Sequence, residues 1–444
     1  MRHPARLIAV VIGLAATMPA AAVAQDADTL RLGLADAVAR ARVHHPAVVQ
    51  AVAERRARDG DVLAGAAAFA PRIDAEFGLL RSTDPVAVFG SRLRQGRFGA
   101  ADLALGALNQ PAPLTDVATT LSLQQPLFQP EALLARRAGR AAARAAALGA
   151  SRTEQTAAFD AVRTYVAARL AEERVVVLRE ALDVARRTLA QVQSLRRNGT
   201  VTVVDEQLAR ARVSEVESGL AAAATARVAA GDLLLAVLGE PAGRPLRLDD
   251  PLTLPMPGAD TSTAGRRDDV AALEAAVAAA DANVSRARGA WVPSAGAFGV
   301  LDWHADRAGI AQGPSHWTAG VVIRWTPFRG LADVGQLRRA EAERDGARER
   351  LSDLRRVADA ETRLARAERT AALASVATAD AALAGAAEAA RVAGVRYAEG
   401  VGTIIELLAV RAAESAQRLA RLQALYQARV ADAALVLSLG RLPE

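Results

Sequence analysis

HWTAGVVIRWTPFRG, the stretch from His316 to Gly330, contains the change of pattern that decides the fold. Alternate positions put one set of largely apolar side chains on a single face: Trp317, Ala319, Val321, Ile323 and Trp325. A period of two predicts a β-strand whose two faces meet different environments. After Pro327 the chain is free of proline for over a hundred residues and rich in Ala, Arg, Leu and Glu, which are strong helix formers. The stretch therefore predicts a strand that turns directly into a long helix.

Three other segments alternate in the same way. The chain is therefore predicted to form four strands, at about 72–82, 116–125, 294–304 and 316–326. The segment 294–304 is less regular, because Phe298 and Val300 lie on the face that is otherwise polar. Alternation of this kind fits a soluble half-buried sheet as well as a membrane sheet. The strands alone leave both interpretations open.

The tryptophans favour the membrane. All four lie at the ends of the last two predicted strands, with Trp291 and Trp325 near the helical end and Trp303 and Trp317 near the loop end. Two belts of this kind are typical of outer-membrane β-barrels, in which aromatic girdles flank an apolar band. Four strands cannot close a barrel around a channel, and open sheet edges are unstable in lipid. Three chains would give 12 strands.

Two proline-free stretches predict unusually long helices, at 129–198 and 329–399. Each would be about 105 Å long at 1.5 Å per residue. Shorter helices are predicted in pairs whose combined length nearly matches one long helix, at 47–70 with 201–238 and at 268–291 with 401–438. This pattern predicts helical struts packed side by side through alanine. A soluble coiled coil fits the helices equally well.

The second half of the chain repeats the first. Pro126 and Pro327, Gly199 and Gly400, and the Leu-Gly pairs at 238–239 and 439–440 are each 201 positions apart. A repeat with one offset at three landmarks indicates an internal duplication. The predicted repeats are 25–240 and 268–444, joined by a linker at 241–267 that contains five prolines.

Residues 1–24 are typical of a secretory signal peptide, with Arg2 and Arg6 before an apolar run and a small-residue cleavage motif before Gln25. An N-terminal membrane anchor is the alternative, although the apolar run is short for one. The rest of the chain has no apolar stretch of 18 residues free of charge, and we expect no transmembrane helix there.

Composition excludes several kinds of chemistry. The 444 residues include no cysteine and no lysine, so all 55 basic side chains are arginine. A disulfide framework, a Walker A loop and a Schiff-base enzyme are therefore excluded. The five histidines show no metal-ligand spacing, and we expect no metal and no cofactor. A pI near 10.7 reflects arginine usage and gives little support for a nucleic-acid partner.

Short motifs along the whole mature chain resemble the TolC family of outer-membrane efflux proteins. They are Leu30–Ala37 with His45-Pro46, Gln125–Phe128, Trp325–Gly330, Arg396–Gly400 with Leu407-Leu408, and Leu437–Gly440. The resemblance implies a mixed α and β membrane protein, a homotrimer with a 12-stranded outer-membrane barrel continued by a periplasmic α-helical barrel. It also implies a passive exit duct that joins a periplasmic adaptor and an inner-membrane transporter, with the RND type as the first expectation.

The same resemblance implies a gate at the periplasmic helix tips. Counted from the turn glycines, Asp205 and Tyr397 match a carboxylate and a tyrosine that link neighbouring helices in the family. Glu406 matches the first of two carboxylates that ring the narrowest aperture. Ala409 stands at the second position, and Gly402 replaces an arginine seen in some members. The turns at Gly199 and Gly400 would present the tips to the adaptor.

Each gate residue also has a simpler interpretation, as a solvated charge at a helix end or a packed tyrosine. We expect His304 and His316 to be solvated beside the second outer loop, and we assign no chemistry to His44 and His45. Two other functions stay open: a periplasmic coiled-coil scaffold and an exported hydrolase. The hydrolase is the weaker, since no nucleophile motif or acid pair supports it.

Overall fold

A computed structural model gives the structure of residues 29–254 and 265–442. The expected signal peptide and the middle of the expected linker lie outside these described residues. The strands are β1 (Leu30–Leu32), β2 (Arg72–Ser82), β3 (Leu114–Phe128), β4 (Leu246–Leu248), β5 (Ser294–Ala305) and β6 (Ser315–Arg324). The α-helices are α1 (Leu34–His44), α2 (Pro46–Ala66), α3 (Pro85–Arg94), α4 (Leu105–Asn109), α5 (Pro130–Arg197), α6 (Val203–Val237), α7 (Asp268–Gly289), α8 (Ala332–Ala398) and α9 (Ile404–Ser438).

Four strands form one antiparallel sheet in the order β2-β3-β5-β6, and their bounds are close to the ranges expected from the sequence. The register of β3 against β5 becomes irregular between Pro126 and Phe128. Pro126 has no N–H to donate to the ladder, and pairing resumes beyond the shift, where Phe128 lies opposite Ala295. Helix α5 then begins at Pro130. Strands β2 and β6 are the two edges of this sheet within the single chain.

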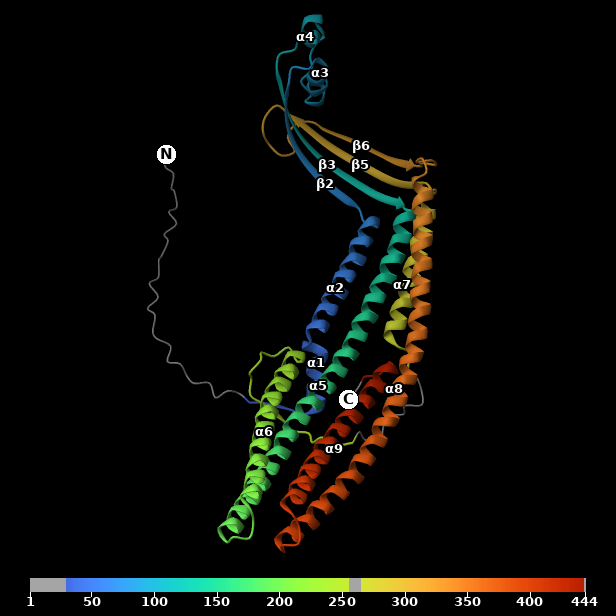
Figure 1. Cartoon of the computed structure of the whole chain (residues 1–444). Coiled ribbons are helices and arrows are strands. Elements are labelled where there is room, and N and C mark those ends of the chain that lie inside the picture. The colour runs from blue at the N-terminus through green and yellow to red at the C-terminus, as the bar shows by residue number, and fades with distance from the viewer. Residues whose placement is uncertain (1–28, 255–264, 443–444) are drawn as a thin grey trace, which may run out of the picture.

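Long helices continue from one end of the sheet (Figure 1). Helix α5 runs beside α2 in its upper half and beside α6 in its lower half, and α8 runs beside α7 and then α9. The hairpins α5–α6 and α8–α9 end at the same pole, far from the sheet (Figure 1). The end-to-end pairing of short helices along each long one is the arrangement expected from their lengths.

The contact face of α8 consists mainly of alanine. Buried positions recur at spacings of seven and eleven residues, at Ala340, Ala347, Ala358 and Ala365, followed by Val376. Repeats of seven and eleven keep one face of a long helix against its neighbours. Small side chains on that face let helix axes approach closely, which is why a chain with only 3% aromatic residues packs such long struts.

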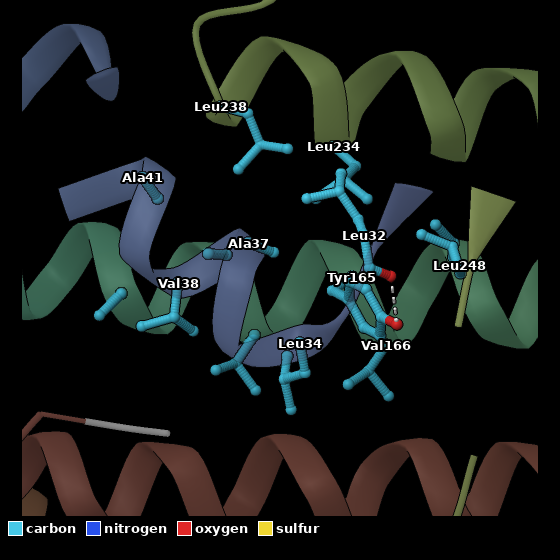
Figure 2. Close-up of a cluster of buried hydrophobic side chains, with 14 of the residues drawn as sticks. Leu32, Leu34, Ala37, Val38, Ala41, Tyr165, Val166, Leu234, Leu238 and Leu248 are labelled. Carbon is cyan, nitrogen blue, oxygen red and sulfur yellow. Dashed lines mark hydrogen bonds between the residues drawn. The ribbon is translucent and has the colours of Figure 1, made fainter. Parts of the chain in front are cut away.

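The largest buried cluster lies where α1 packs against α5, at the middle of the helical region (Figure 2). Leu32, Leu234 and Leu238 are almost fully buried there. The Tyr165 hydroxyl donates to the carbonyl of Leu32 at 3.1 Å and accepts from the backbone N–H of Asp250 at 3.1 Å. Burial raises the pKa of Tyr165 to about 12, so the phenol stays neutral. The parallel pair β1–β4, which the sequence analysis did not predict, is joined to α5 in this way.

Helices α6 and α8 are long and apolar enough, by length and composition alone, to cross a membrane. Neither helix contains 18 successive residues free of charge, which is why their sequences did not predict a transmembrane helix. The apolar window of each helix contains at most two charged residues, and only 11% and 6% of the two windows is buried in the single chain.

The prediction that His304 is solvated is wrong. Its side chain is 8% exposed, and its Nδ1 lies 2.9 Å from the Asp116 carboxylate. The cause is the connection between β2 and β3, which folds into α3 and α4 at the loop end of the sheet and packs against it (Figure 1). His316 is exposed, but its Nε2 lies 2.9 Å from the carbonyl oxygen of Arg94 in that connection. His45 caps α2, because its Nδ1 accepts from the N–H of Ala47.

Candidate functional site

The two helical tips share one turn geometry. Gly199 and Gly400 have φ angles of +74° and +77°, a left-handed conformation that glycine adopts without strain. The N–H of Gly199 donates to Arg196 and that of Gly400 donates to Tyr397, which closes the ends of α5 and α8. Thr202 and Thr403 then cap the next helices, accepting from the N–H groups of Asp205 and Glu406. The two tips therefore have equivalent turns, each closed by a backbone hydrogen bond and followed by a capped helix.

A small apolar core joins the two hairpins at the tips. It contains side chains from all four helices: Val192, Ala209, Ala393, Tyr397, Ile404 and Leu407. Val192 is fully buried and Tyr397 is 6% exposed. Buried contacts between the hairpins mean that opening the tips would expose apolar surface. The pole far from the sheet is therefore held together by packing as well as by polar groups.

Tyr397 brings a buried hydroxyl into this core that has no hydrogen-bond partner among the residues the structure describes. Burial raises the pKa of Tyr397, and the nearby charge of Asp205 raises it further. The carboxylate of Asp205 instead accepts from the N–H and the hydroxyl of Thr202, at 2.7 and 2.9 Å. The structure brings the two residues near each other without a hydrogen bond between them, and the proposed link between them stays a prediction.

Glu406 is exposed at the start of α9, and its carboxylate lies 4.0 Å from the guanidinium of Arg396. Ala409 is also exposed, one turn further along. The N–H of Gly402 donates to the carbonyl of Arg396 at 3.0 Å, and a Cβ at position 402 would lie 3.1 Å from the backbone nitrogen of Tyr397. A larger side chain at Gly402 would therefore push against the turn.

Glu206 is a buried charge that the sequence analysis missed. Its side chain is 7% exposed and pairs with Arg196 of α5 and with Arg210 at 2.6 Å. The hydrogen bond from Arg196 lowers the pKa of Glu206, and it outweighs the burial that opposes it. The i,i+4 spacing to Arg210 was the available sequence signal. The equivalent position in the second hairpin is Leu407. Ion pairs therefore stabilise the first hairpin at the position where apolar packing stabilises the second.

The four tryptophans lie at the two ends of β5 and β6. Trp317 and Trp325 are 78% and 61% exposed, while Trp291 and Trp303 are partly covered. The indole N–H of Trp325 donates to the carbonyl of Trp291 at 3.1 Å, so these two meet at the helical end. Trp317 on β6 lies opposite Leu301 on β5. Trp303 is two residues beyond Leu301 on β5 and therefore lies on the same face of the sheet. Among the described residues, no group of three or more His, Asp or Glu is placed to hold a metal ion.

Solved structures share this fold. The outer membrane protein VceC of Vibrio cholerae matches with a TM-score of 0.77 and 20% identity, covering 93% of this chain and 97% of that one. The CmeC outer membrane channel of Campylobacter jejuni matches with a TM-score of 0.75 and 15% identity, covering 92% of this chain and 85% of that one. The open state of the MtrE outer membrane channel of Neisseria gonorrhoeae matches with a TM-score of 0.74 and 19% identity, covering 92% of this chain and 89% of that one. A search of curated protein sequences found no match.

An antiparallel sheet continued by two helical hairpins that meet at one pole places the chain among the outer-membrane channels of the efflux class. The chain belongs to the outer membrane efflux protein family, whose profile matches residues 37–240 and 261–441. It is therefore a channel of the outer membrane with a helical periplasmic part, and it conducts solutes without catalysing a reaction. The expected resemblance to the TolC family is confirmed.

Proposed function

We propose that three copies of this chain form a passive exit duct, with a 12-stranded barrel in the outer membrane and an α-helical barrel in the periplasm. The single observation that supports this best is the sheet with two open edges, β2 and β6. Unpaired backbone groups at an edge cost several kcal/mol each in lipid, so the edges must pair with other chains. The edge β6 of one protomer then pairs with β2 of the next until the ring closes.

The helices of three chains continue the wall of this ring. Each chain would supply two long struts, α5 and α8, with their shorter partners stacked end to end along them. The tandem repeat that we infer explains this, since one duplicated unit of two strands and a hairpin gives both halves of the protomer. The turns at Gly199 and Gly400, the helix caps Thr202 and Thr403, and the Leu-Gly helix ends recur at one offset.

The duct would act with partners. We propose that the tips dock on a periplasmic adaptor and receive substrate from an inner-membrane transporter, the RND type being the first expectation. Asp205, Tyr397 and Glu406 would form the gate, and the turns at Gly199 and Gly400 the docking points. The transporter would choose the cargo, because the duct only conducts what reaches it.

Fractionation tests the proposal. We expect a heat-modifiable trimer in the outer-membrane fraction. A soluble periplasmic monomer would support the coiled-coil scaffold instead.

The tryptophan belts give a second, independent test against the scaffold. Trp317 and Trp325 are exposed and should lie at the two interfaces of the bilayer. In variants that keep only one of them, lipids brominated near the headgroup should quench the fluorescence strongly. A scaffold with an incidental sheet predicts no quenching, and Trp→Phe at both positions provides the baseline.

A further inference from the structure

The register of the sheet separates a polar face from an apolar one. Across the loop end, Thr120 pairs with Asp302, and Asp302 pairs with His316. The hydroxyl of Thr120 donates to the carboxylate of Asp302 at 2.6 Å. The neighbouring row on the other face is Leu121, Leu301 and Trp317. In the barrel proposed above, the apolar row faces lipid and the polar row therefore faces the lumen.

Helix α3 packs on the polar, lumenal face. Asp116 lies on the same face of β3 as Thr120, and it is 6% exposed. Its carboxylate accepts from the Ser91 hydroxyl at 3.0 Å and from the Gln95 side-chain amide at 2.9 Å, both on the inward surface of α3 and its C-cap. On the next strand, His304 contacts the same carboxylate. The α3 connection is thus bound to the lumenal side of two strands.

Further bonds fix the end of this helix. The Gln95 amide also donates to the backbone carbonyls of Thr115 and Ala305, at 3.0 and 3.2 Å. His316, on the third strand, contacts the carbonyl of Arg94. Val88, on the same helix, is also buried and is 3% exposed. A buried carboxylate with several hydrogen-bond partners favours one position of the helix over others.

We propose that α3 forms a second constriction, at the extracellular mouth of the duct. The inference rests on the proposed trimeric barrel, in which three copies of α3 would lie over the lumenal face at the exit. Asp116 is the anchor that holds each copy in place, with Ser91 and Gln95 as its partners on the helix side. The constriction limits the size of solutes that pass the mouth and acts independently of the periplasmic tips.

The absence of cysteine from the chain makes this testable by thiol labelling, since every thiol is then an introduced one. Thr318→Cys places a reporter on the lumenal face of β6, deeper than His316, and Ala319→Cys places a matched control on the lipid face next to it. Both positions are exposed in the single chain. Whole cells are labelled from outside with a small maleimide and with a large maleimide-polyethylene glycol.

The anchor is released with Ser91→Ala and Gln95→Ala together, which leaves the Asp116–His304 pair inside the sheet intact. Val86→Ala is the control on the same helix, because Val86 is 81% exposed. We expect the large reagent to label Thr318→Cys at least about tenfold faster in the double variant, given the loss of two hydrogen bonds to a carboxylate. The small reagent should label at an unchanged rate, and Val86→Ala should change neither rate.

The outcomes separate the two proposals. If the small reagent labels Ala319→Cys as well as Thr318→Cys from outside, or labels neither, the barrel itself is contradicted. If the small reagent labels only Thr318→Cys but the large reagent reacts equally fast with and without the anchor, the barrel stands and the constriction is contradicted. Should the double variant fail to reach the outer membrane, Gln95→Ala alone gives the same comparison with a smaller expected increase.

Discussion

Tyr397 and Asp205 lie on different hairpins, and the carboxylate of Asp205 adds to the effect of burial in raising the pKa of the Tyr397 phenol, yet no hydrogen bond joins them. The phenol is neutral at physiological pH and has a proton to donate, but it has no acceptor among the described residues of the single chain. A buried donor without an acceptor costs about 1–3 kcal/mol. The tip therefore contains a hydroxyl donor without a partner, close to a carboxylate that is able to accept a hydrogen bond.

The first prediction concerns this pair. If the link forms in the closed trimer, Tyr397→Phe combined with Asp205→Asn should weaken the closed state and raise single-channel conductance. Asparagine keeps an oxygen that can accept from Thr202, so the helix cap survives while the charge is lost.

Measurements on planar bilayers would show the increase. The same pair has a second readout in stability: a hydroxyl that stays without a partner makes Tyr397→Phe stabilising by about 1 kcal/mol. Unchanged conductance together with that gain in stability would discard the link.

A second prediction concerns ion selectivity at the tips. Glu406 should make the aperture prefer cations, and Arg396 at 4.0 Å offsets part of its charge. Glu406→Gln should lower the ratio of cation to anion permeability, whereas Arg396→Gln and Ala409→Glu should each raise it. Reversal potentials in a salt gradient measure the ratio.

Glu388→Gln is the control for selectivity, because Glu388 is an exposed partner of Arg391 on α8, away from the tip. If all four variants have the same ratio of cation to anion permeability, the narrowest aperture is not at Glu406.

The third prediction concerns pH at the first hairpin. Because the folded state lowers the pKa of Glu206, its ion pairs stabilise the tip fully above the ordinary glutamate value of about 4.3 and lose that contribution as the pH falls through the lower, folded value. Hydrogen exchange at the α5–α6 tip should therefore accelerate below pH 4 by more than exchange at mid-helix. Glu206→Gln should remove this difference.

Glu217 gives the matched control, since its pair with Arg186 is exposed. Surface pairs contribute little, so Glu217→Gln should leave the exchange profile unchanged. An equal effect of both variants would mean that burial of Glu206 has no special role.

A fourth prediction uses the turn glycines. An added Cβ at Gly199 or Gly400 meets no atom within 4 Å, so the only cost of alanine there is the left-handed backbone, about 1 kcal/mol. Each Gly→Ala variant should lower stability by this amount. Gly385 within α8 is the control, where alanine is also unobstructed and should stabilise by up to about 1 kcal/mol. Thermal unfolding of the purified protein would show the loss of stability in the two turn variants and the gain in Gly385→Ala.

The sequence predicted the long helices and the four strands because proline, alanine and a period of two act locally. It could not predict the burial of His304, which depends on α3 folding back over the sheet. The pair β1–β4 joins residues that lie more than two hundred positions apart, and three residues carry too little pattern to find it. The Thr202–Asp205 cap could have been found, because Thr-x-x-Asp is close to a capping-box pattern.

For the proposed gate residues, the sequence predicted a position along the helices but not their contacts. The resemblance placed Asp205, Tyr397 and Glu406 at the tips, where the structure also has them. It could not reveal that Asp205 caps its own helix, that the Tyr397 hydroxyl lacks a partner, or that Glu206 is buried between two arginines. Those features depend on how two hairpins meet, and a linear pattern does not contain that information.

Planar-bilayer conductance of the detergent-extracted protein, with the oligomer size determined on the same sample, tests the central claim most directly. We expect a trimer with a small, cation-preferring conductance that rises when the tips are released. A monomer without channel activity would contradict the trimeric duct.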